Sequence, residues 1–140
     1  MENRKIVWVS TTFADHASLG RNAEHILDLV IVSWKEIDRV LRPIIGKGGI
    51  EPLFHRSVEI TAQAYPWLTA ASTSAQSTMD FGQLRNALAN ENTSHFAGAS
   101  DMLLGHFHYL LTILIGLSLT DRLLRPVLDP LLNGTAAKDI

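Results

Sequence analysis

The chain has 140 residues, of which 46% are hydrophobic and 19% are charged. This composition is typical of one folded domain and excludes a long disordered interaction segment, because so much apolar surface can be buried. Twelve basic and fourteen acidic residues give a net charge of −2, which creates no overall field for binding nucleic acid or anionic lipid. The lack of cysteine excludes disulfides, thiolate metal sites and a catalytic thiol.

The first residues of the chain are predicted to form an arm. The apolar stretch Ile6–Val9 is shorter than the hydrophobic region of a signal peptide, so we expect no export and a cytoplasmic location. A single strand at this place would lack a partner. Residues 1–20 are therefore predicted to be an N-terminal arm that packs on the body of the protein or on a second subunit.

Two helices are predicted in the first half. Apolar residues recur every three or four positions over residues 22–45, which predicts a helix with a wide core face. The second helix is predicted to begin at Pro52, because proline suits the first helical turn, and to stop at Pro66. Residues 69–79 are rich in Ser, Thr and Ala and are predicted to be a flexible loop.

Three further helices are predicted in the second half. The pattern Asp80-x-x-Gln83 resembles a capping box and predicts a short helix after it. A long helix is predicted from about Ser94 to Gly116, and Ser118-x-x-Asp121 resembles the cap of a last helix. Residues 133–140 are predicted to be a disordered tail.

The stretch 102–120 is long enough to cross a membrane and contains no Asp, Glu, Lys or Arg. It contains His106 and His108, however, and it is flanked by Asp101 and Asp121 instead of basic residues. We therefore expect a long buried central helix, with a membrane span as the open alternative. The predicted fold is all-α, a single compact bundle of four to five helices over residues 1–132.

An eight-residue segment occurs twice in the chain. Asp38–Ile45 (DRVLRPII) recurs eighty-three positions later as Asp121–Leu128 (DRLLRPVL), and we interpret the two copies as a pseudo-symmetric pair of helix ends. In each copy the first aspartate and the second arginine are four residues apart, a spacing that stabilises a helix through an ion pair. Alternatively, guanidinium groups converge on an anion such as a phosphate or a nucleotide. The candidate ligand-binding residues are Arg39, Arg42, Arg56, Arg122 and Arg125.

The sequence contains no recognised catalytic or metal-binding pattern. Its six histidines form neither H-E-x-x-H nor Glu-x-x-His, and no G-x-S-x-G is present. The glycines of Gly46–Gly49 are not followed by the Lys-Ser/Thr pair of a phosphate loop. We therefore expect no enzymatic activity, no metal and no cofactor.

Three stretches, Gly46–Ser57, Pro66–Leu68 and Ile115–Leu123, resemble a set of small all-helical bacterial proteins without an assigned activity. The likeness runs from about Ala23 to Leu128 and consists mostly of apolar and glycine positions that specify packing. The resemblance implies a bacterial origin and a compact helical bundle. It implies no catalytic residue.

The leading functional hypothesis is a non-enzymatic interaction or regulatory protein that acts through apolar helix faces on a partner protein or on a copy of itself. Small bundles with wide apolar faces often complete their cores by pairing, which makes a homo-oligomer the expected state. The predicted interface residues are Leu27, Ile31 and Trp34. The alternative is a sensor or binding protein for a small anionic ligand that uses the arginines of the repeated segment.

Overall fold

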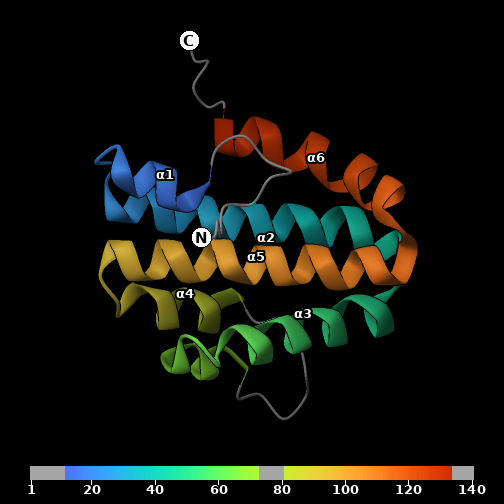
Figure 1. Cartoon of the computed structure of the whole chain (residues 1–140), viewed down its shortest axis with the longest axis horizontal. Coiled ribbons are helices and arrows are strands. Elements are labelled where there is room, and N and C mark those ends of the chain that lie inside the picture. Colours follow the sequence, from blue (N-terminus) through green and yellow to red (C-terminus); the bar gives the residue numbers. More distant parts are fainter. Residues whose placement is uncertain (1–11, 73–80, 134–140) are drawn as a thin grey trace, which may run out of the picture.

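The computed structural model describes residues 12–72 and 81–133, and it contains no strand within these ranges. Its elements are α1 (Phe13–Ser18), α2 (Ala23–Ile45), α3 (Lys47–Thr61), the 3-10 helix η1 (Pro66–Ser72), α4 (Phe81–Ala89), α5 (Thr93–Ile115) and α6 (Leu117–Asn133) (Figure 1). The prediction of an all-α bundle is confirmed, with six α-helices in the described part instead of four to five.

Parts of three predicted segments lie outside the described residues: 1–11 of the arm, 73–79 of the loop and 134–140 of the tail. Most of the described remainder of the arm and of the loop is helical. Residues 13–18 form α1, and residues 66–72 form η1. Residues 69–72, which are the start of the predicted loop, therefore belong to the 3-10 helix η1. This helix packs against α3 and α4.

Helices α2 and α5 run side by side through the middle of the molecule (Figure 1). Figure 1 shows α1 and α6 on one side of this pair and α3 and α4 on the other. The largest buried side chain is that of Trp34, whose ring makes edge contacts with Phe54 of α3 and Phe107 of α5, each at 5.1 Å between centroids. Aromatic pairs prefer this edge-to-face arrangement. The core therefore lies where α2, α3 and α5 meet.

The second half of the chain repeats the first half in outline. Helices α2 and α5 both have 23 residues, and their N-caps, Asn22 and Asn92, lie seventy positions apart. Each cap side chain accepts backbone N–H groups of the first turn. The second helix of each half packs on the long helix of the other half: α3 packs on α5, and α6 packs on α2. Buried positions also match at this spacing: Ile26 with Phe96, Trp34 with Leu104, Ile37 with Phe107 and Leu41 with Leu111.

A single glycine joins the two long helices of each half. Gly46 has φ 75° and Gly116 has φ 91°, a left-handed conformation that side chains rarely adopt. The N–H of Gly116 donates to the Thr112 carbonyl at 2.8 Å, and the Gly116 carbonyl accepts the Thr120 N–H at 3.1 Å. One residue thus ends α5 and starts α6, so that the chain reverses without a loop.

This turn explains why two predicted helix starts are wrong. α3 begins at Lys47 and contains Pro52 in its interior, and α6 begins at Leu117 and already includes Ser118. The glycine turn starts each helix directly and makes a side-chain cap unnecessary. The repeated segment is likewise not a pair of helix ends: Asp38–Ile45 ends α2, whereas Asp121–Leu128 lies inside α6.

Asp101 of α5 fixes the short helix α1 in place. Its two carboxylate oxygens accept the N–H groups of Phe13 at 2.8 Å and Ala14 at 2.9 Å. At the other end of α1, the buried His16 ring donates from Nε2 to the Leu132 carbonyl of α6 at 2.8 Å. A six-residue helix is not stable alone, so these contacts to α5 and α6 hold it. Burial raises the pKa of Asp101 from 3.8 to about 6.

The raised pKa of Asp101 predicts a pH-dependent stability. Between about pH 4 and pH 6 the folded protein holds a proton on Asp101 that the unfolded chain has lost. The free energy of unfolding should therefore fall as the pH rises through this window, by at most about 1.4 kcal/mol per pH unit from this group. Asp101→Asn should remove that component in urea unfolding at pH 4.5 to 7.5, whereas parallel pH profiles of variant and wild type would contradict it.

The glycine turn predicts opposite effects for two alanine substitutions. Gly116→Ala places a side chain at φ 91° and should lower the free energy of unfolding by about 1 kcal/mol. Gly48→Ala in α3 meets nothing within 4 Å and should raise it by roughly 0.5 kcal/mol, because alanine favours a helix over glycine. Urea unfolding of both variants measures the difference, and equal shifts would refute the role of the turn.

Candidate interaction surface

The predicted interface residues lie in the core. Leu27, Ile31 and Trp34 are only 4%, 7% and 0% exposed. The wide apolar face of α2 is covered within the same chain, since α3, α4 and α6 all pack on this helix. These three side chains are therefore part of the core of the chain, and the prediction that they form an intermolecular contact is wrong.

Exposed apolar side chains gather instead at the junction of α5 and α6. Tyr109, Ile113, Leu114 and Leu117 are 63%, 65%, 57% and 56% exposed, and we call these four residues the α5–α6 surface. With Leu119, they make up five of the eight exposed large hydrophobic side chains in the described part of the chain. Isolated exposed apolar residues are ordinary, but a contiguous patch marks an interaction site or a ligand site.

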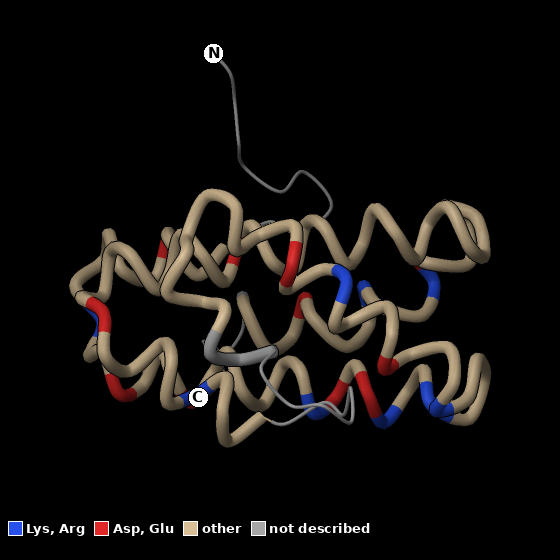
Figure 2. Tube along the Cα trace, turned by 90° about the horizontal axis from the view of Figure 1, so that it is seen from below, with Lys and Arg blue, Asp and Glu red and all other residues tan. Residues whose placement is uncertain are grey.

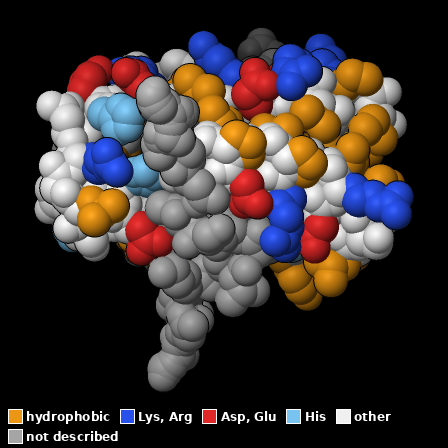
Figure 3. Space-filling view, turned by 90° about the horizontal axis from the view of Figure 1, so that it is seen from above, with side chains coloured by type: hydrophobic (Ala, Val, Ile, Leu, Met, Phe, Trp, Pro, Cys, Tyr) orange, Lys and Arg blue, Asp and Glu red, His pale blue; other side chains and the backbone are white. Residues whose placement is uncertain are grey.

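All four side chains lie close to the α5–α6 junction in the sequence, but only two of them share one helix face. Tyr109 and Ile113 are four residues apart on α5 and share one face of it. Leu114 and Leu117 lie on either side of the Gly116 turn, at the end of the bundle. In the space-filling view, hydrophobic side chains gather over the half of the molecule that holds this turn (Figure 3). α5 is thus the central helix, with eight buried side chains between Phe96 and Leu111 and exposed apolar side chains in its last turns.

The first half of the chain shows that the fold does not need apolar residues at two of these four positions. Seventy positions earlier, the equivalents of the α5–α6 surface are Arg39, Pro43, Ile44 and Lys47. All four equivalents are exposed. Arg39 and Lys47 are cations, whereas Pro43 and Ile44 are apolar like their second-half equivalents. Packing of the chain therefore does not require apolar residues at Tyr109 and Leu117.

Polar contacts fix the relative position of the two helices that carry this surface. His108 of α5 lies 3.2 Å from the Asp121 carboxylate of α6, and Arg125 lies 3.8 Å from the same carboxylate. Burial lowers the pKa of His108, although the contact with Asp121 opposes this. The equivalent hairpin of the first half is joined by Arg42 and Glu51 at 3.3 Å. Both hairpins are thus cross-linked through a carboxylate at the same position of the second helix, Glu51 and Asp121.

The structure does not bring the five candidate arginines together. Four of them face carboxylates: Arg39 and Glu36 are 2.8 Å apart, Arg42 and Asp38 2.8 Å, Arg56 and Glu59 3.7 Å, and Arg125 and Asp121 3.8 Å. Arg56 is on α3, on the opposite side of the bundle from α6 (Figure 1). Basic and acidic residues are mixed along the trace in Figure 2. The two aspartate–arginine pairs of the repeated segment stabilise their own helices, as their spacing predicts.

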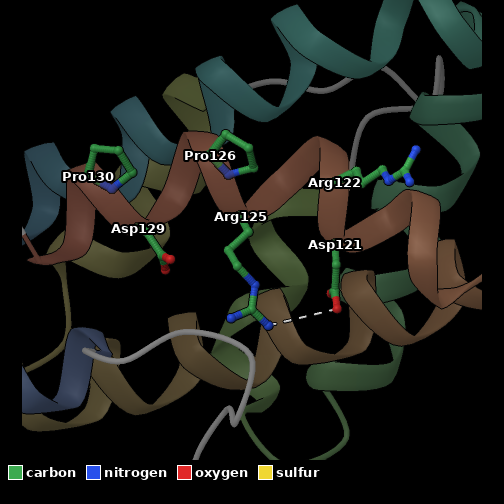
Figure 4. A pocket seen from close by; sticks show the side chains of 6 residues that line it. All are labelled: Asp121, Arg122, Arg125, Pro126, Asp129 and Pro130. Atoms are coloured by element: carbon green, nitrogen blue, oxygen red, sulfur yellow. Dashed lines mark ion pairs between the residues drawn. The ribbon is translucent and has the colours of Figure 1, made fainter.

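A shallow groove of about 570 Å³ runs along α6. It is lined by Asp121, Arg122, Arg125, Pro126, Asp129 and Pro130 (Figure 4). The guanidinium groups of Arg122 and Arg125 point in different directions, and Arg125 points toward Asp121 (Figure 4). Charges of both signs line the groove, which does not favour an anion.

Within the described ranges, no group of three or more His, Asp or Glu side chains is arranged to hold a metal ion. No helix in those ranges is both long enough and apolar enough to cross a membrane. No family model, curated protein or solved structure matches the chain. The resemblance to small helical bacterial proteins thus remains a prediction.

The contacts of the arginines predict unequal structural roles. Arg42 joins α2 to Glu51 of α3, whereas the ion pair of Arg39 within the described residues is with Glu36 of its own helix. Arg42→Ala should lower the free energy of unfolding by about 1 kcal/mol, and Arg39→Ala should lower it by less, because water screens the exposed Arg39–Glu36 pair. Urea unfolding measures both. A loss of stability from Arg39→Ala as large as that from Arg42→Ala would contradict this assignment.

Proposed function

We propose that the protein is a non-enzymatic interaction or regulatory protein that acts through the α5–α6 surface on a partner protein or on a copy of itself. The observation that carries this proposal is the difference between the two halves of the chain. Tyr109 and Leu117 occupy exposed positions whose first-half equivalents are Arg39 and Lys47. Apolar side chains exposed to water are unfavourable, and burying them against another molecule removes that exposure.

The proposal replaces the predicted interface but keeps its chemistry. An apolar helix face is still the contact, but it is the last part of α5 and the start of α6 in place of α2. The cytoplasmic location and the bacterial origin expected from the sequence remain predictions.

The anionic-ligand alternative has less support. It requires several guanidinium groups to converge on one site. Arg39, Arg42 and Arg56 face carboxylates of their own helices, and Arg122 and Arg125 point apart in the α6 groove. The described arginines therefore form no convergent site for an anion.

Photo-cross-linking in cells tests the proposed function. A photoreactive amino acid at position 109 should yield adducts of discrete mass, because the side chain there would be covered by the bound molecule. The matched control places the same amino acid at position 39, the first-half equivalent, which is also exposed. Adducts specific to position 109 are expected. If neither position gives an adduct, or if both give the same adducts, the α5–α6 surface is not the contact.

A further inference from the structure

We infer that α1 is a detachable helix, which leaves the bundle as a unit, and that a negative charge on the Asp101 carboxylate promotes its release. Release uncovers the buried site that the Phe13 ring fills. Helix α1 lies at the opposite end of the molecule from the turn between α5 and α6 (Figure 1). Its release is therefore independent of the α5–α6 surface and of the function proposed for that surface.

Polar contacts at both ends and one aromatic ring hold α1 on the bundle. At its start, Asp101 of α5 accepts the N–H groups of Phe13 and Ala14. Toward its end, His16 donates to the Leu132 carbonyl of α6. The Phe13 side chain is 0% exposed and belongs to the hydrophobic core. The attachment of α1 thus depends on a few identifiable groups.

Most of the core does not depend on α1. The other buried side chains of the hydrophobic core belong to the helices α2 to α6 and to η1. Gly20, with φ 76°, separates α1 from α2, and a Cβ atom at this glycine would meet nothing within 4 Å. A six-residue helix has no stability of its own, so α1 is either docked or unfolded. It can therefore open locally while the longer helices stay packed.

The second half of the chain holds its short helix without a carboxylate at the equivalent position. Helix α4 precedes α5 as α1 precedes α2, and it packs on α2. Its buried side chains include Leu84 and Leu88. Seventy positions before Asp101, α2 has Ile31, which is 7% exposed. The fold thus accepts an aliphatic side chain where α5 has Asp101, so packing does not require the carboxylate.

The position of the Asp101 carboxylate makes docking depend on its charge. Burial raises the pKa of Asp101 from 3.8 to about 6, and it outweighs the N–H groups of Phe13 and Ala14, which favour the charged form. The charge of Asp15 on α1 also disfavours it. Once α1 has left, the carboxylate faces water and has its ordinary pKa. Closing therefore takes up a proton between about pH 4 and pH 6, and α1 opens more as the pH rises through this window.

Other titratable side chains at this contact come from α1 and α2. Asp15 accepts the Thr12 N–H at 2.9 Å within the capping box of α1. The His16 ring lies 6.5 Å from the His25 ring of α2, between centroids. From α6 the contact is the backbone carbonyl of Leu132, which does not titrate. Asp101 is the carboxylate that faces the start of α1 from another helix, and both histidines need a separate control.

Hydrogen exchange of the full chain, followed by NMR, tests whether α1 opens as a unit. The amides of Phe13, Ala14 and His16 should be at least about 100-fold less protected than those of Leu103 and Leu104 in the core of α5. Their exchange should hardly change between 0 and about 1 M urea, because local opening exposes little surface. Equal protection of both sets, with equal dependence on urea, would show that α1 opens only when the whole chain unfolds and would overturn the inference.

The pH dependence of the same exchange tests the role of Asp101. After correction for intrinsic rates, the opening constant of α1 should rise by up to about tenfold per pH unit and by roughly 100-fold between pH 4 and 6.5, because one proton is released. Asp101→Asn should make it independent of pH. His16→Gln, whose amide can still donate to the Leu132 carbonyl, and His25→Gln should each keep the dependence. A flat wild-type profile, or a dependence that is lost with either histidine, would reject the role of Asp101.

A second variant tests α1 without relying on pH. Phe13→Ala removes the α1 side chain that lies in the hydrophobic core, so the amides of α1 should lose their protection. The amides of Leu103 and Leu104 should remain protected, and circular dichroism should show a folded helical chain. Loss of the whole fold in Phe13→Ala, or protection of α1 equal to that in the wild type, would contradict a detachable helix.

Discussion

The architecture depends on two glycines that adopt a backbone conformation which other residues rarely adopt. With positive φ at Gly46 and Gly116, the chain reverses between long helices over a single residue. Each reversal leaves the following helix antiparallel to the one before it, with cross-links between them such as Arg42 to Glu51 and His108 to Asp121. Two rigid hairpins result, and their exchanged packing, α3 on α5 and α6 on α2, builds the core.

The two hairpins share a framework but differ on their surfaces. Their buried positions match at a spacing of seventy residues, since the same core must be filled from both sides. Their exposed positions are free of that constraint. At these positions the first hairpin has Arg39 and Lys47, and the second has Tyr109 and Leu117. The first hairpin thus serves as an internal control for the second, and it separates what folding requires from what it does not.

The repeated eight-residue segment shows how sequence similarity and structural equivalence can diverge. Asp38–Ile45 and Asp121–Leu128 are eighty-three positions apart, whereas structurally equivalent residues are seventy apart. The segment ends α2 in one half and lies inside α6 in the other. Its Asp-x-x-x-Arg spacing and its aliphatic residues suit any amphipathic helix. The likeness therefore reflects shared helix chemistry, and the prediction of a pseudo-symmetric pair of helix ends is wrong.

The sequence by itself determined the helical class and the extents of the two long helices, which were predicted over 22–45 and about 94–116 and are found at 23–45 and 93–115. Local signals suffice there, because apolar periodicity and helix-terminating glycines act within a few residues. Only the tertiary structure decided which apolar faces are covered. Leu27 and Trp34 are buried by helices distant in the sequence, while Tyr109 and Ile113 are left exposed. Apolar periodicity in the sequence shows that one side of a helix is apolar. How many neighbouring helices pack against that side depends on the fold of the whole chain.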